Sequence, residues 1–127
     1  MSVPVICGTI LVAHGSRDPL WRGSIEAVAR KILAVSPQAQ VRCAFLELAA
    51  PDLPTSVAEL VALGVDSITV VPLLLGVGKH VREDLTRLMA LLRASYPNLQ
   101  FCLRPAMGEE TQIIELMARI AISSHDE

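Results

Sequence analysis

Three side chains that commonly bind transition metals, His14, Glu47 and His80, occur at equal intervals along the chain. Two imidazoles and one carboxylate suit a divalent ion such as cobalt, iron, nickel or zinc. Three protein ligands leave coordination positions open, which a site that exchanges its metal requires. Because these residues are far apart in the sequence, they form a site only if the fold brings them together.

Each of the three residues also has a purely structural interpretation. His14 is then a core histidine bonded to a backbone group, and Glu47 is a buried carboxylate paired with an arginine such as Arg17. His80 is then a solvent-exposed residue at the start of a helix. Residue type alone leaves both interpretations open.

The apolar run that ends at His14 is typical of a strand buried on both faces, and three further segments also have the composition of strands. The predicted strands cover residues 3–13, 41–48, 67–75 and 99–103. Between them, apolar residues recur at helical spacing. The predicted helices begin at Asp18-Pro19, at Thr55-Ser56, at Val81 and after Gly108.

This alternation with short links predicts an α/β fold. We expect one domain over residues 1–122, a four-stranded parallel sheet flanked by helices on both faces, and a frayed tail over 123–127. Pro72 lacks a ladder donor, so regular pairing should end or bulge near it, and Gly64 should stop the second helix. The residues expected on the inner face of the last helix are Ile113, Leu116, Met117 and Ile120.

The carboxyl ends of parallel strands joined by right-handed crossovers lie at one edge of the sheet, where ligands of open α/β sheets bind. We therefore expect His14, Glu47 and His80 at that edge. Four basic residues flank the same segments, which suits an anionic ligand close to a metal. The alternative is that helix starts simply expose charge. The four basic residues are Arg17, Arg22, Lys79 and Arg82.

Composition argues against several classes of partner. The formal net charge is −2 and aromatic residues make up 3% of the 127 residues, which argues against binding to nucleic acid or an anionic membrane. We expect no signal peptide and no membrane-spanning segment. Cys7, Cys43 and Cys102 are odd in number and lie in apolar segments, so we interpret them as buried, reduced thiols of a cytoplasmic protein.

In the order of its motifs the sequence resembles the small class II tetrapyrrole chelatases, the short CbiX and SirB type that acts on sirohydrochlorin. The likeness covers nearly the whole chain. Two positions depart from it: Lys79 stands where members commonly carry glycine, and Thr86 where they carry proline. The matching motifs are Ala13-His14-Gly15-Ser16-Arg17, Ala44-Phe45-Leu46-Glu47-Leu48 with Pro51, Val71-Pro72-Leu73-Leu74-Leu75-Gly76, Gly78-Lys79-His80 and Asp84-Leu85.

The resemblance implies that His14 and His80 are the catalytic metal-binding pair and that Glu47 assists them. It implies a lyase-class enzyme that inserts a divalent ion into sirohydrochlorin during cobalamin- or sirohaem-type biosynthesis. Cobalt is the first choice of metal, with iron and nickel as alternatives, and the ion is a substrate, so no tightly bound cofactor is expected. The expected substrate-binding residues are Ser16, Arg17, Arg22, Lys79 and Arg82.

Longer members of this family resemble two such domains fused, so this chain looks like one half and is expected to form a two-fold homodimer. Two other functions use similar residues. A non-enzymatic metal or tetrapyrrole carrier would have the same ligands. Histidine-dependent phosphoryl transfer ranks last, because Ala13 rather than an arginine precedes His14.

Overall fold

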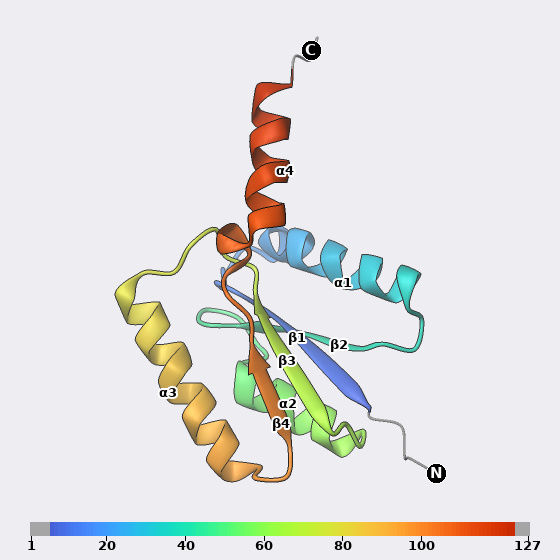
Figure 1. Ribbon diagram of the computed structural model, residues 1–127. Helices are drawn as coiled ribbons and strands as arrows, with labels where there is room; N and C mark the ends of the chain where they lie inside the picture. The colour runs from blue at the N-terminus through green and yellow to red at the C-terminus, as the bar shows by residue number, and fades with distance from the viewer. Residues whose placement is uncertain (1–5, 124–127) are drawn as a thin grey trace.

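The computed structural model describes residues 6–123 of the chain. Its strands form one parallel sheet in the order β2–β1–β3–β4 (Figure 1). The strands are β1 (Cys7–Ala13), β2 (Gln40–Phe45), β3 (Ser67–Pro72) and β4 (Gln100–Leu103). The helices are α1 (Gly23–Val35), α2 (Leu53–Ala62), α3 (Lys79–Ser95) and α4 (Thr111–Ile122), with 3-10 turns η1 (Pro19–Arg22) and η2 (Met107–Glu109).

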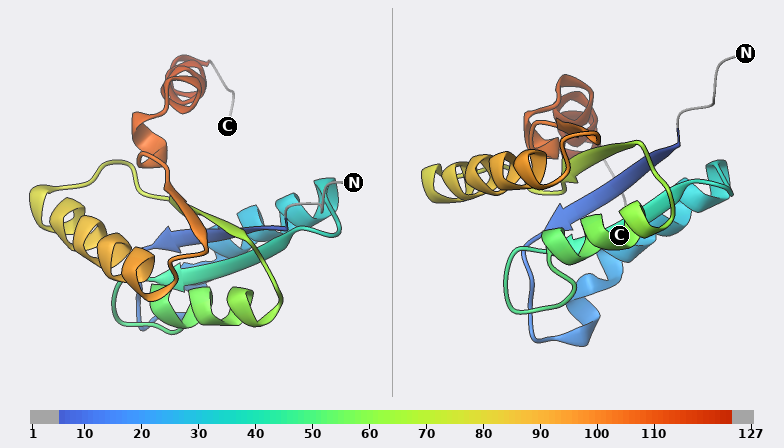
Figure 2. Two further views of the ribbon diagram at one scale, coloured as in Figure 1. Left: turned by 60° about the horizontal axis from the view of Figure 1, so that its bottom comes forward. Right: turned by 90° about the horizontal axis from the view of Figure 1, so that it is seen from below.

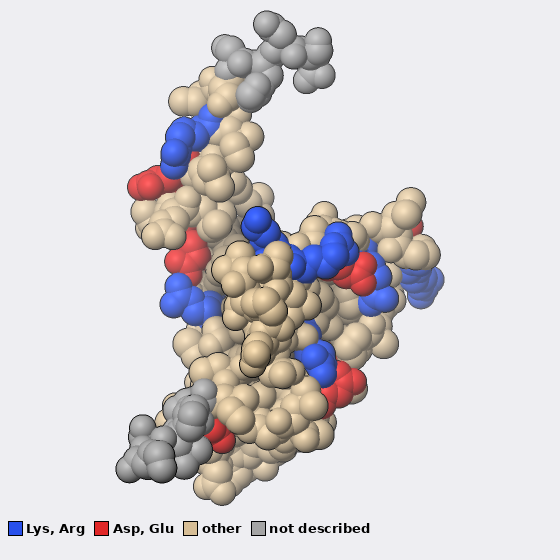
Figure 3. All heavy atoms as spheres, turned by 90° about the vertical axis from the view of Figure 1, so that its right-hand side faces the viewer, with Lys and Arg blue, Asp and Glu red and all other residues tan. Residues whose placement is uncertain are grey.

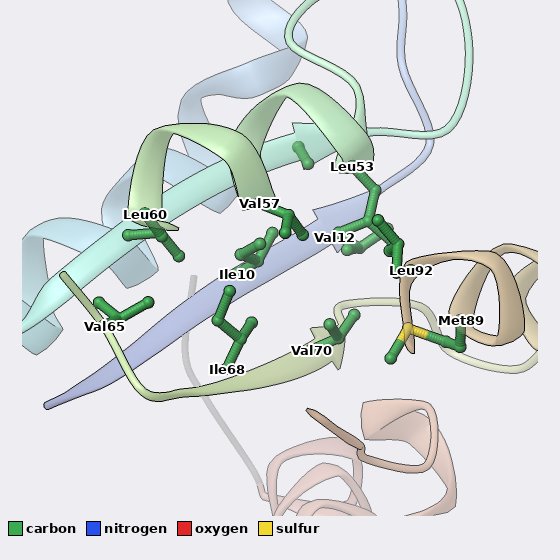
Figure 4. Close-up of a cluster of buried hydrophobic side chains, with 11 residues drawn as sticks. Ile10, Val12, Leu53, Val57, Leu60, Val65, Ile68, Val70, Met89 and Leu92 are labelled. Atoms are coloured by element: carbon green, nitrogen blue, oxygen red, sulfur yellow. The ribbon is translucent and has the colours of Figure 1, made fainter. Parts of the chain in front are cut away.

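Strand β1 is central and buries side chains on both of its faces. Ile10 and Val12 pack with residues of α2 and α3, including Val57 and Met89 (Figure 4). Leu11 and Ala13 point to the opposite face, where α1 contributes Ile25. Helix α1 therefore covers one face of the sheet, and α2 and α3 cover the other (Figure 2). The predicted α/β class, with a four-stranded parallel sheet between helices, is confirmed.

Two strands end earlier than the apolar pattern predicts. Strand β2 stops at Phe45 rather than Leu48, because residues after it bend back and the Phe45 amide donates a hydrogen bond of 2.9 Å to the Pro51 carbonyl. Strand β3 stops at Pro72, as expected from the donor that proline lacks. Most of the predicted N-terminal extension of β1, residues 3–5, lies outside the described residues, as does the expected tail apart from Ser123.

The helices begin at other residues than the apolar spacing predicts, and an aspartate side chain caps the start of η1 and of α2. Asp18 caps the turn η1, and α1 begins only at Gly23. Helix α2 begins at Leu53, two residues before the predicted start, because Asp52 is its N-cap. Helix α3 begins at Lys79 rather than Val81. The predicted stop at Gly64 is confirmed, since this residue has a φ of 86° in the left-handed region.

Replacing Asp52 with alanine should lower the free energy of unfolding by about 1 kcal/mol at pH 7. Its carboxylate accepts a 2.9 Å hydrogen bond from the Thr55 amide. Hydrogen bonds from the Thr55 side chain and amide lower the pKa of Asp52. A carboxyl whose pKa is lowered on folding stabilises the protein above its unfolded pKa, and this contribution disappears as the pH falls through the folded pKa.

Chemical denaturation of Asp52→Ala and of the parent chain at several pH values measures this stability loss and its pH dependence. The stability difference should shrink below about pH 4. A difference that is the same at pH 3 and pH 7 would contradict the capping role.

The prediction that α4 packs an inner apolar face against the sheet is wrong. Within this helix Ile113 is half-buried and every other residue is exposed, including Leu116 at 48% and Ile120 at 61%. The spacing of its apolar residues is helical, but α4 continues past the edge of the sheet and stands away from the body (Figure 1). Figure 3 shows it as an arm with few charged side chains.

The three cysteines are free, but the expectation that they are buried is wrong for two of them. Cys7 is exposed at the first residue of β1, and Cys102 is exposed on the edge strand β4, where its neighbours Phe101 and Leu103 face the core instead. Cys43 is half-buried. Burial, followed by the charge of Glu26, raises the pKa of the Cys43 thiol. Among residues 6–123, no helix is long and apolar enough to span a membrane.

Candidate functional site

His14 and Glu47 meet at the carboxyl edge of the sheet. The Nδ1 atom of His14 lies 3.3 Å from Oε1 of Glu47, and both side chains are about half exposed. His14 follows β1 directly, while Glu47 lies in the loop after the neighbouring strand β2. The sequence placed Glu47 inside a strand, which is wrong, but the loop still carries it to the expected edge.

The backbone around Gly15 holds the Glu47 loop in place. The Leu46 amide donates a 3.0 Å hydrogen bond to the Ala13 carbonyl, which joins the loop to the end of β1. A side chain at Gly15 would place its Cβ 1.5 Å from the Glu47 carbonyl oxygen, so only glycine permits this approach. Leu48, with a φ of 61°, turns the chain back immediately after Glu47.

Arg22 secures the far side of the same loop. Its guanidinium donates a 2.8 Å hydrogen bond to the Ala50 carbonyl and lies 4.7 Å from the centre of the Phe45 ring. A cation–π contact of this kind helps to hold the guanidinium in place. These contacts join η1 to the start and the end of the loop that bears Glu47, and they are separate from the substrate contact expected for Arg22.

Helix α3 closes a cavity of about 220 Å³ beside the His14–Glu47 pair. Its lining residues from α3 recur at helical spacing: Val81, Asp84, Leu85 and Leu88. Asp84, which is not among the predicted site residues, brings a second carboxylate to this cavity. The signal was present, because Asp84 lies one helical turn after His80 and residues four apart share a helix face.

His80 is exposed in the first turn of α3. The structure brings His14 and Glu47 together, but the described residues contain no set of three histidine, cysteine, aspartate or glutamate side chains gathered closely enough to hold a metal ion. His80 instead stands one turn from Asp84, on the helix that lines the cavity.

The expected substrate-binding residues lie around this edge of the sheet, and they differ in their contacts and in their exposure. Ser16 and Arg17 line a second cavity of about 530 Å³ on the outer side of the Glu47 loop. The Ser16 hydroxyl accepts a 3.1 Å hydrogen bond from the Asp18 amide. Arg82 pairs with Glu109 at 3.4 Å, while Lys79 is exposed at the start of α3.

A family model for CbiX matches residues 8–123, which is nearly the whole described chain. The chain belongs to the CbiX family. Its relatives include the sirohydrochlorin cobaltochelatase of Saccharolobus solfataricus, which is 30% identical over 118 residues, or 88% of this chain and 91% of the relative. The sirohydrochlorin cobaltochelatase of Methanopyrus kandleri is 34% identical over 82 residues, or 65% of this chain and 57% of the relative.

Solved structures agree with this family assignment. A putative cobalamin (vitamin B12) biosynthesis CbiX protein from Marinobacter aquaeolei VT8 superposes with a TM-score of 0.76 at 30% identity, covering 91% of this chain and 93% of that one. The sirohydrochlorin chelatase SirB from Bacillus subtilis subspecies spizizenii, solved in complex with cobalt, gives a TM-score of 0.73 at 26% identity. This CbiX-family chain covers half of that SirB chain.

Proposed function

We propose that this CbiX-family chain is a sirohydrochlorin chelatase that takes cobalt as its preferred metal, with His14, Glu47 and His80 as the residues that handle the ion. The observation that carries the proposal is the His14–Glu47 pair beside a cavity at the ligand-binding edge of the sheet. Relatives named sirohydrochlorin cobaltochelatase support the choice of substrate and metal.

Metal insertion exchanges two pyrrole N–H protons for one divalent ion. If Nδ1 of His14 carries the proton and donates a hydrogen bond to Glu47, the Nε2 lone pair is free to bind the ion. His80 supplies the second imidazole from α3. The Glu47 carboxylate, or an imidazole that has released the ion to the ring, accepts one pyrrole proton as general base, and the second proton leaves to water. Acid suppresses the reaction, because protonated imidazoles bind no metal.

Basic residues near the edge bind the acidic periphery of the tetrapyrrole. Arg17 and Ser16 lie on one side of the Glu47 loop, and Lys79 and Arg82 lie on α3. Holding the ring over the metal is catalysis by positioning. Arg22 contributes by holding the loop as well as by its charge.

The functional unit we propose is a two-fold homodimer located in the cytoplasm. SirB supports the dimer, because this chain matches half of that longer chain at 91% coverage of its own length. Two copies would then supply what one longer chain contains.

The experiment that tests the activity is an insertion assay with sirohydrochlorin and Co²⁺, Fe²⁺ or Ni²⁺ in parallel, followed by the visible absorbance of the ring. We expect enzyme-dependent turnover with all three and the highest kcat/KM with Co²⁺. Stoichiometric binding of metal or ring without turnover would instead identify a carrier.

A further inference from the structure

Asp84 is the charged side chain that α3 contributes to the cavity beside the His14–Glu47 pair. His14 reaches this cavity from the end of β1, Glu47 from the loop after β2 and Asp84 from a helix. The cavity therefore joins one imidazole to two carboxylates that come from three different segments of the chain. The other residues of α3 that line it are apolar: Val81, Leu85 and Leu88.

The ion pair that Asp84 makes within α3 is weak. Its Oδ1 atom lies 3.3 Å from Nη1 of Arg87, three residues further along the helix, and both side chains are 69% exposed. Exposed pairs of this kind contribute little to stability. The contact with Arg87 therefore does not explain why a carboxylate lines the cavity, and a divalent ion can displace the guanidinium from Asp84.

His80 occupies the position one helical turn before Asp84. Residues four apart share a helix face, with Cβ atoms about 5–6 Å apart, so an imidazole and a carboxylate at this spacing can bind one divalent ion between them. His80 is exposed and is not among the residues that line the cavity. Asp84 is therefore the group that connects the imidazole on α3 with the His14–Glu47 pair.

We infer that Asp84 is a further ligand of the divalent ion, which it binds together with His80 on α3 and holds at the cavity that His14 lines. This role of Asp84 rests on the chelatase function proposed above and extends it, because it explains how an imidazole outside the cavity acts on an ion at the cavity. The two ligands on one helix leave the other coordination positions open for His14, for water and for the nitrogens of the ring.

Calorimetric titration of the full chain with Co²⁺, in the absence of any tetrapyrrole, tests this ligand. Asp84→Asn should raise the Kd for Co²⁺ at least about 10-fold, since even residues that only support a ligand change metal affinity by about 10- to 100-fold. His80→Ala should raise the Kd by a similar factor. The double variant should raise it by less than the product of the two factors, because the two side chains bind the same ion.

Two neighbours of Asp84 on α3 provide matched controls. Glu83→Gln removes the same charge three residues after His80, at a position that is not among those lining the cavity, and should leave the Kd within about 2-fold of the parent value. Arg87→Gln breaks the ion pair of Asp84 but keeps its carboxylate. It should leave the Kd unchanged or lower it, because it removes the cation that competes with Co²⁺.

The insertion assay gives a second readout. Asp84→Asn should raise the KM for Co²⁺ at least about 10-fold and leave the KM for sirohydrochlorin within about 2-fold, which separates a metal ligand from a residue that binds the ring. Because the Asp84 side chain is 69% exposed, the far-ultraviolet circular dichroism spectrum should not change. Asp84→Glu keeps a carboxylate and should bind Co²⁺ more tightly than Asp84→Asn.

A parent chain that binds no Co²⁺ without tetrapyrrole, or an Asp84→Asn variant that binds it like the parent, would overturn the assignment of Asp84. Equal effects of Asp84→Asn and either control would also overturn it, as would single effects of Asp84→Asn and His80→Ala that simply multiply. The titration needs no tetrapyrrole, so a parent chain that binds Co²⁺ through Asp84 but shows no turnover would refute the chelatase and leave this metal ligand standing.

Discussion

Replacing His14 with alanine is expected to lower the rate of metal insertion into sirohydrochlorin at least about 100-fold, beyond the loss typical for residues that only support a metal ligand. The substitution removes an imidazole that is half exposed and bonded only to Glu47 in the described structure, so the fold should survive. His80→Ala should lower the rate in the same way, since it removes the second imidazole. Steady-state insertion assays and thermal unfolding measure the two effects.

The third histidine, His125, provides a matched control, although it lies outside the described residues. His125→Ala should retain the parent rate. Parent-like turnover in both His14→Ala and His80→Ala would contradict the assigned roles. Loss of the rate together with a large fall in the unfolding midpoint would mean that His14 is structural, as its alternative interpretation holds.

Replacing Gly15 with alanine is expected to disable the site without touching a metal-binding side chain. The new Cβ would lie 1.5 Å from the Glu47 carbonyl oxygen and 3.1 Å from the Ala49 amide nitrogen, so the loop has to move. We expect a loss of about 1–3 kcal/mol in the free energy of unfolding, the usual range for overpacking. We also expect a fall in insertion rate comparable to that of Glu47→Ala, because the displaced loop carries Glu47 away from His14.

Gly23→Ala is the control for this substitution. A Cβ at Gly23 meets no atom within 4 Å, and the residue is the first of α1 with helical φ and ψ. It should leave the rate unchanged and stabilise the chain slightly, by up to about 1 kcal/mol. If Gly15→Ala and Gly23→Ala had the same free energy of unfolding and the same insertion rate, the close approach of Gly15 to the Glu47 backbone would not be needed for the activity.

The sheet could be predicted because its signal is local. Ile10, Leu11 and Val12 are apolar on both faces, and they lie in the central strand that is buried on both faces. Pro72 ended its strand for the expected reason. In contrast, Glu47 lies outside its strand, because the chain turns back there and the Phe45 amide donates a hydrogen bond to the Pro51 carbonyl. The spacing of apolar residues does not indicate such a turn.

The candidate site was predictable in part. Parallel strands placed His14 and Glu47 at one edge, and the structure brings them to 3.3 Å. Asp84 was not predicted, because it lies within a helix and not at the end of a strand, and it reaches the cavity only through the face of α3 on which it falls. Helix α4 was predicted to pack against the sheet, because its apolar residues have the spacing of a core helix. That spacing does not show what the apolar face packs against.

The proposed mechanism requires the two imidazoles to share one ion. A crystal structure of the protein soaked with Co²⁺, with the ion located by its anomalous scattering, measures this directly. We predict one Co²⁺ with a nitrogen of His14 and a nitrogen of His80 each about 2.1 Å away, within one chain or across the dimer. Cobalt bound to neither histidine, or to each histidine as a separate ion, would contradict it.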